Sequence, residues 1–147
     1  MQGVILKDRE GVLKYLLDTD TCVYLLNGSE ALKAKIKEIG VFSIAVSNSV
    51  LSELYFGAYN SKKVEANLKR IEEFKKNISV ISDSEESAEH FGRIKAALRI
   101  EGKIIEDFDI IIASIALANR YVLVTNNTSH FKRIEGLIFE NWLEAKA

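Results

Sequence analysis

The segment LLDTDTCVYLLNG, residues 16–28, decides the fold prediction. An apolar run in it is followed at once by two carboxylates, Asp18 and Asp20. The apolar residues after them are spaced as on a helix, and the pair Asn27-Gly28 is typical of a helix end. We therefore expect a buried strand that ends at Asp18 and a helix over residues 19–26. An acidic group where a buried strand ends is typical of the rim of a functional site.

Short apolar strands alternate with helices along the rest of the chain. We expect the strands over residues 14–18, 41–47, 78–81, 121–125 and 137–140. We expect the helices over residues 19–26, 30–39, 49–59, 62–76, 84–100 and 109–119. The expected N-caps are Ser29, Ser49 and either Asp83 or Ser84. The alternation predicts an α/β fold, a three-layer α/β/α domain around a central, mainly parallel sheet of about five strands.

The composition is that of an ordinary folded domain. The chain has 147 residues, of which 48% are hydrophobic and 28% charged, which argues against disorder and against a membrane protein. A single cysteine, Cys22, excludes an internal disulfide and a cysteine-rich zinc site, and it fits a cytoplasmic protein. The net charge of −1 does not indicate nucleic-acid binding, so RNA would need a local basic patch or a metal ion.

Three carboxylates on separate elements are the candidate catalytic groups. Asp18 ends the first strand, Glu53 stands among apolar residues of its helix, and Asp109 opens an apolar helix. Each has a structural alternative. Asp18 could cap the following helix, Glu53 could lie on a solvated helix face, and Asp109 could be favoured in the first turn by the helix dipole. In parallel sheets the ligand site lies beyond the carboxyl ends of the strands. Carboxylates gathered there need a cation, and oxygen ligands suit Mg²⁺ or Mn²⁺, which activates water for phosphodiester cleavage.

Three blocks of the sequence carry a resemblance to a known family. They read KYLLDTDTCVYLLNG, SNSVLSELYFGA and DFDIIIASIALANRYVLVTNNTSHFKRIEGLIFENW, and they span about residues 14–143. In their order and spacing they resemble the PIN-domain family, in particular its VapC-type toxins. The resemblance implies a metal-dependent endoribonuclease that forms a homodimer, cleaves RNA and is held inactive by a VapB-type antitoxin. It implies catalytic roles for Asp18, Glu53 and Asp109, with Asp18 and Asp109 as the magnesium ligands.

The chain departs from the family pattern at two positions. The first block usually reads D-T-N, and here Asp20 replaces the asparagine. The fourth acid usually falls just before the phenylalanine of the V-T-N-N region, where this chain has His130; Asn127 is the other candidate for that place. Thr125 is expected to hydrogen-bond a carboxylate, and Asp107 is a candidate outer-sphere ligand. Alternatively, His130 is a surface histidine or one that only supports the residues of the site.

Residues 1–13 are expected to be an N-terminal extension of uncertain role, and residues 14–147 the PIN-like nuclease domain. The family typically begins immediately before K-Y-L-L-D-T, so residues before this block suggest a start codon assigned upstream of the usual one. The apolar stretch at residues 4–6 alternatively predicts a strand or hairpin. Two groups of basic residues are candidates for RNA contact or for solvated helix faces: Lys62, Lys63, Lys69, Arg70, Lys75 and Lys76, and Arg93, Lys95 and Arg99.

Two other functions stay open at this point. The D-T-D-T stretch also resembles the D-x-D-x-T block of haloacid-dehalogenase-type phosphatases, with Asp18 as nucleophile and Asp20 as acid–base. That block is usually followed by a β-flap, whereas CVYLLNG predicts a helix. Replacing Asp20 by asparagine would abolish a phosphatase and largely spare a nuclease. The third function is a PIN-like scaffold that only binds RNA or a partner.

Overall fold

A parallel sheet forms the centre of the molecule. The computed structural model describes residues 7 and 11–143. The strands are β1 (Tyr15–Leu17), β2 (Ile44–Ser47), β3 (Ser79–Ile81), β4 (Val122–Val124) and β5 (Phe139–Glu140). They lie in the order β3-β2-β1-β4-β5, and every neighbouring pair is parallel. The predicted five-stranded sheet is confirmed.

The three inner strands consist of buried residues, which explains their short apolar sequences. Every residue of β1, β2 and β4 is buried. Leu16, at the centre of β1, is paired with Ala45 on one side and with Leu123 on the other. A strand covered on both faces reads as a continuous apolar run rather than as an alternating one. The edge strands β3 and β5 carry exposed residues.

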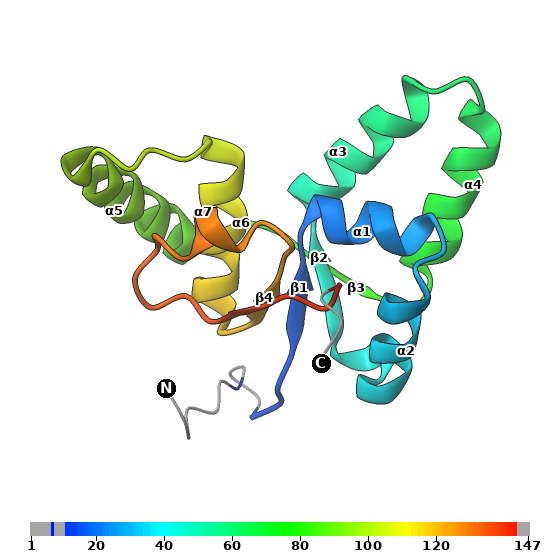
Figure 1. Cartoon of the computed structure of the whole chain (residues 1–147), viewed down its shortest axis with the longest axis horizontal. Coiled ribbons are helices and arrows are strands. Elements are labelled where there is room, and N and C mark those ends of the chain that lie inside the picture. Colours follow the sequence, from blue (N-terminus) through cyan, green and yellow to red (C-terminus); the bar gives the residue numbers. More distant parts are fainter. Residues whose placement is uncertain (1–6, 8–10, 144–147) are drawn as a thin grey trace.

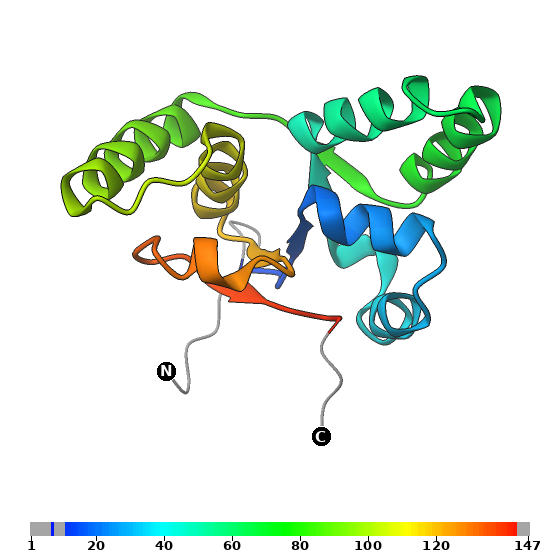
Figure 2. The same cartoon turned by 45° about the horizontal axis from the view of Figure 1, so that its top comes forward.

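Helices cover both faces of the sheet (Figure 1, Figure 2). Four helices pack together on one side: α1 (Thr19–Leu26), α2 (Glu30–Ile39), α3 (Asn48–Tyr59) and α4 (Val64–Lys75). The other side holds α5 (Glu85–Glu101), α6 (Asp107–Asn119) and the short α7 (Thr128–Phe131). Helix α6 has seven buried residues and packs on α5 and β4. This arrangement confirms the predicted α/β/α layering.

Side chains cap most of the helices at their N-termini. Asp18, Ser29 and Ser84 accept hydrogen bonds from the first turns of α1, α2 and α5, as the sequence predicts for the two serines. The prediction of Ser49 as the cap of α3 is wrong. Oγ of Ser47 instead accepts from the backbone N–H of Val50 at 3.1 Å, so the helix begins one residue earlier than expected.

Other boundaries also differ from the expectation. Residues 41–43 form the 3-10 helix η1 (Val41–Ser43), so the second strand starts only at Ile44. Helix α6 begins at Asp107, which places Asp109 within its first turn, and α7 was not expected at all. Arg120 caps the C-terminus of α6 in a left-handed conformation with φ of 60°. The strand or hairpin expected at residues 4–6 lies outside the described residues.

No helix in the described part of the chain is long and apolar enough to cross a membrane.

Candidate active site

The candidate site lies where β1 and β4 end. Asp18 directly follows β1, and its backbone N–H donates to the carbonyl oxygen of Val124 at 3.1 Å. Its Oδ1 accepts from the backbone N–H of Thr21 at 2.9 Å, so the side chain caps α1. The Thr21 hydroxyl donates to the carbonyl oxygen of Val124 at 3.2 Å. The chain therefore holds this carboxylate against the ends of both strands.

The buried carboxylate of Asp18 is held by neutral groups. Only 6% of the residue is exposed. Burial raises the pKa of the Asp18 carboxyl above its ordinary value, and the nearby charge of Asp20 raises it further. Hydrogen bonds from Thr125 and Thr21 oppose this rise. The surroundings therefore make the ionised form of Asp18 unfavourable, and a bound cation would relieve this.

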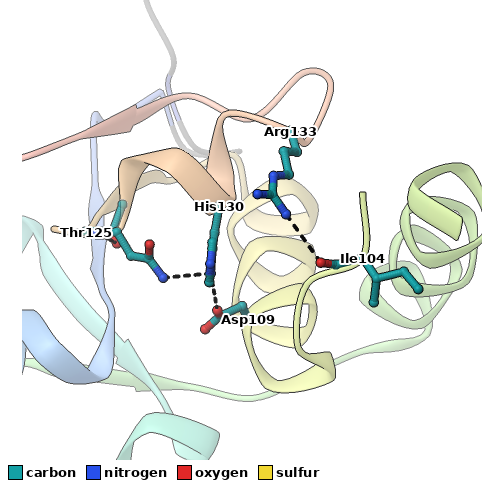
Figure 3. Close-up of polar contacts among 6 residues, drawn as sticks. Ile104, Asp109, Thr125, His130 and Arg133 are labelled. Atoms are coloured by element: carbon teal, nitrogen blue, oxygen red, sulfur yellow. Dashed lines mark hydrogen bonds and ion pairs between the residues drawn. The ribbon is translucent and has the colours of Figure 1, made fainter. Parts of the chain in front are cut away.

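Asp109 faces the site from the first turn of α6, where it meets His130 (Figure 3). Nδ1 of His130 lies 3.4 Å from Oδ2 of Asp109 and 2.8 Å from Nδ2 of Asn127. Burial raises the pKa of the Asp109 carboxyl, His130 opposes the rise, and the charges of Glu106 and Asp20 add to it. Residues from α6 and α7 thus meet at one point.

The position of Nδ1 limits how His130 can act. A ring nitrogen that carries a proton donates a hydrogen bond, and one without a proton accepts. Nδ1 therefore serves Asp109 as a donor only when it is protonated. Because Nδ2 of Asn127 can only donate, a protonated Nδ1 requires the Asn127 amide to be flipped so that its oxygen faces the ring. In this arrangement His130 orients Asp109 with Nδ1 and leaves Nε2 for other contacts.

Two further predicted residues belong to this region. Asp20 lies in the first turn of α1, and its charge raises the pKa of both Asp18 and Asp109. Thr125 is buried, and its Oγ1 accepts from the backbone N–H of Asn127 at 2.9 Å. The structure therefore brings Asp18, Asp20, Asp109 and the segment after β4 to one rim.

Comparison with known proteins decides the family. Residues 15–137 match the PIN domain family. The chain belongs to the PIN domain family. It is 38% identical to Ribonuclease VapC2 of Rickettsia felis over 135 residues, which cover 87% of this chain and 97% of the relative. It is 34% identical to the tRNA(fMet)-specific endonuclease VapC of Shigella flexneri, across 89% of this chain and 99% of that protein.

Solved structures of PIN domains agree with the fold. A chain of VapBC2 from Rickettsia felis, bound to a DNA fragment from their promoter, superposes with a TM-score of 0.84 at 36% identity, over 88% of this chain and 99% of that one. DNA-bound VapBC from Salmonella typhimurium gives a TM-score of 0.84 at 32% identity, over 89% and 99% of the two chains. Family membership overturns the phosphatase alternative, and α1 indeed follows Asp18 where that class has a flap.

Two predicted residues of this PIN domain lie apart from the contacts described above. Glu53 is exposed on α3 and lines a pocket of about 250 Å³ between α1, α3 and α4, together with Val23 and Arg70. Asp107 is held by Lys95 of α5, whose Nζ lies 3.0 Å from its Oδ1. The ion pair favours a structural role for Asp107 over that of an outer-sphere ligand.

The donor set of the PIN domain fits a divalent metal that keeps most of its water. Within residues 7 and 11–143, no three His, Cys, Asp or Glu side chains lie close enough together to hold a metal ion. Mg²⁺ is usually bound in proteins by one or two carboxylates, several waters and substrate phosphates. Asp18 and Asp109 supply two carboxylates whose ionised forms are less favourable here than in water, because burial raises the pKa of both. They therefore fit such an ion.

Sequence reasoning missed the contribution of Thr21. Its backbone N–H and hydroxyl join Asp18 to the end of β4. The sequence contained a signal for this contact. An aspartate at an N-cap normally accepts from the backbone N–H two or three residues later, which here is that of Thr21.

Proposed function

We propose that this PIN domain is the toxin of a VapBC-type toxin–antitoxin pair and that it cleaves RNA as a metal-dependent endoribonuclease. The observation that carries the proposal is the pair Asp18 and Asp109. Both are carboxylates with raised pKa, and they lie at the carboxyl-end rim of the sheet. The names of the similar relatives, which are ribonucleases and a tRNA(fMet)-specific endonuclease, support the reaction class.

In this proposal Asp18 and Asp109 hold Mg²⁺ or Mn²⁺. A divalent ion bound there lowers the pKa of its water and stabilises charge on the phosphate being cleaved. Thr21 and Thr125 fix Asp18 by hydrogen bonds, and His130 fixes Asp109. These contacts hold the two carboxylates in place before the metal and RNA arrive, which lowers the cost of ordering them.

Three other residues complete the proposed site. Glu53 of α3 is the proposed third catalytic carboxylate, and it would act from the pocket between α1, α3 and α4 rather than through contact with Asp18 or Asp109. Asn127 supports His130, and Asp20 adds negative charge beside both proposed ligands. Because His130 stands where a fourth acid is usual, the site has one carboxylate fewer to attract the metal.

The test is cleavage of a mixed RNA pool that includes initiator tRNA, with the purified protein in Mg²⁺, in Mn²⁺ and in EDTA. We expect fragments with either metal and none in EDTA. The Asp18→Asn and Asp109→Asn variants should each lose more than about 100-fold in rate, since loss of a group behind a metal ligand already costs 10–100-fold. An Asp107→Asn variant is the matched control and should keep most of the activity. Cleavage that persists in EDTA would exclude the metal mechanism.

We also propose that the protein pairs with a VapB-type antitoxin. The solved structures that it resembles are VapBC complexes. A groove of about 800 Å³ between α1, α2 and α4 offers a place for such a partner. Its lining includes apolar side chains such as Leu25, Ile36 and Phe74. It also includes four cations and one carboxylate: Lys33, Lys37, Lys69, Arg70 and Glu73. An amphipathic segment with acidic side chains matches this groove.

The proposed oligomer is a homodimer, and the proposed compartment is the cytoplasm. Two aromatic side chains one turn apart on α3, Phe56 and Tyr59, are 65% and 66% exposed, and a second copy would cover them. Sedimentation of the purified protein tests the dimer, and a single species of 16.5 kDa would exclude it. Cell fractionation tests the compartment.

A further inference from the structure

A basic pocket lies beside the candidate active site. Its volume is about 440 Å³. Three of its lining side chains are cations, one carries a hydroxyl, and no carboxylate is among them: Lys103, Lys132, Arg133, Ser129, Ile104 and Gly102. It is therefore suited to an anion.

Both walls of the pocket lead directly into the site. One wall is the segment 102–104, which runs on to α6 and so to Asp109. The other is the segment 129–133, which contains His130. Nη1 of Arg133 donates to the carbonyl oxygen of Ile104 at 3.3 Å and joins the two walls (Figure 3). The chain thus connects the pocket on both walls to the elements that carry Asp109 and His130.

The charges of the pocket are available to a ligand. Lys103, Lys132 and Arg133 are exposed, and within the described residues none of them forms an ion pair with a carboxylate. On the helices, by contrast, Lys76 pairs with Glu73 at 3.0 Å and Lys95 with Asp107 at 3.0 Å. Among the described residues, three cations therefore gather at this edge of the site without a salt bridge to a carboxylate.

We propose that this pocket binds a backbone phosphate of the RNA, adjacent to the phosphate that is cleaved. The inference rests on the proposed ribonuclease function. An acidic site repels RNA, and a chain of net charge −1 has to hold the polyanion by local cations. The lining favours RNA over an acidic peptide, because Ile104 is its single large apolar side chain, whereas several apolar side chains line the groove between α1, α2 and α4.

Binding of a fluorescent single-stranded RNA, measured by anisotropy over a range of salt concentrations, tests the pocket. The protein carries Asp18→Asn so that the RNA stays intact. We compare it with the same protein carrying Lys103→Gln and Lys132→Gln. The slope of log K against log salt should become shallower by about 0.7 for each phosphate that the variant no longer neutralises. The matched control carries Lys33→Gln and Lys35→Gln on α2, which lies on the other side of the sheet from α7 (Figure 1).

The outcomes separate this inference from the proposed function. A shallower slope in the pocket variant alone supports the pocket, as does a KM raised several-fold at unchanged kcat in the cleaving protein. Equal slopes in both double variants would overturn the inference that the pocket binds RNA. So would a pocket variant that weakens an antitoxin complex while RNA binding is unchanged. RNA that binds with the expected slopes but is never cleaved overturns the proposed function alone. Replacing both lysines by arginine should restore binding.

Discussion

At the scale of single residues, Asp18 is placed where its charge is costly. It is 6% exposed, and burial raises the pKa of its carboxyl. Its hydrogen bond with Thr21 serves α1 as a cap, but asparagine would cap as well. The charge is therefore not needed for the fold, and this separates the structural role of the residue from its proposed role in binding metal.

Asp18→Asn is expected to raise the melting temperature at pH 7 in EDTA. A carboxyl with a raised pKa binds its proton more tightly in the folded state, so stability falls as pH rises from the ordinary value of 3.8 through the folded pKa. The cost therefore grows as pH rises above 3.8 and levels off above the folded pKa, and the two proteins should converge at pH values below 3.8.

Saturating metal should reverse the order of the two proteins. Mg²⁺ at about 100 times its Kd adds about 2.7 kcal/mol to a protein that binds it only when folded. The wild type should gain this stability, and Asp18→Asn should gain little. Thermal melts in EDTA and in Mg²⁺ across the pH range measure both effects. An Asp18→Asn protein less stable than the wild type at pH 7 in EDTA would contradict this account of the buried charge.

His130 is expected to act through Asp109. His130→Ala should lower the cleavage rate by about 10–100-fold, the usual loss when a group behind a metal ligand is removed. His130→Glu should let the metal act at lower concentration, because it adds a carboxylate beside Asp109. Rates measured over a range of Mn²⁺ concentrations distinguish the two variants. His90, the other histidine, contacts Arg93 on α5, so His90→Ala is the control and should behave as the wild type.

At the scale of elements, the sequence predicted the strands and the long helices, whose apolar residues recur with a regular spacing. The strands and long helices were found with boundaries within a few residues, because buried runs and amphipathic spacing are local signals. Helix α7 has four residues and no side-chain cap, and its place depends on contacts of Thr125, Asn127 and His130. The short helix η1 likewise has no capping side chain. Such elements are determined by tertiary contacts, which the local pattern does not contain.

The start of α3 offers a direct test of capping. Ser47 and Ser49 lie two positions apart and both resemble a cap, but only Ser47 accepts from the first turn. Ser47→Ala should cost about 1 kcal/mol of unfolding free energy. Ser49→Ala should cost clearly less, since it removes only the hydrogen bond of 2.6 Å between the two hydroxyls. Urea denaturation measures both, and equal losses would contradict the assignment of Ser47 as the cap.

At the scale of the whole molecule, the topology explains which parts of the site could be predicted. β1 and β4 are neighbours in the sheet, so strand-end residues far apart in sequence meet. Parallel pairing therefore predicted the rim that contains Asp18 and Thr125. The pairing of Asp107 with Lys95 and the position of Glu53 in a separate pocket depend on how α3, α5 and α6 pack, and no spacing in the sequence reports that.

The groove between α1, α2 and α4 predicts how the antitoxin binds. Reversing two charges of the groove, with Lys33→Glu and Lys37→Glu, should weaken the complex with the proposed antitoxin and leave RNA cleavage by the free protein unchanged. The reason is that an acidic segment would meet two carboxylates in place of two ammonium groups. Calorimetric titration with a VapB-type antitoxin that binds this protein measures the effect. Lys62→Glu with Lys63→Glu is the control, and an equal loss there would argue against the groove.

The pairing of β1 with β4 also has a consequence for the timing of synthesis. The Thr21 hydroxyl binds the carbonyl of Val124, a residue 103 positions later in the chain. A ribosome adds about 5–20 residues per second, so roughly 5–20 s pass between these two residues. During that interval the nascent chain has its first carboxylate but not the strand that holds it in place. The contacts that hold Asp18 against the end of β4 can therefore form only after Val124 has been made.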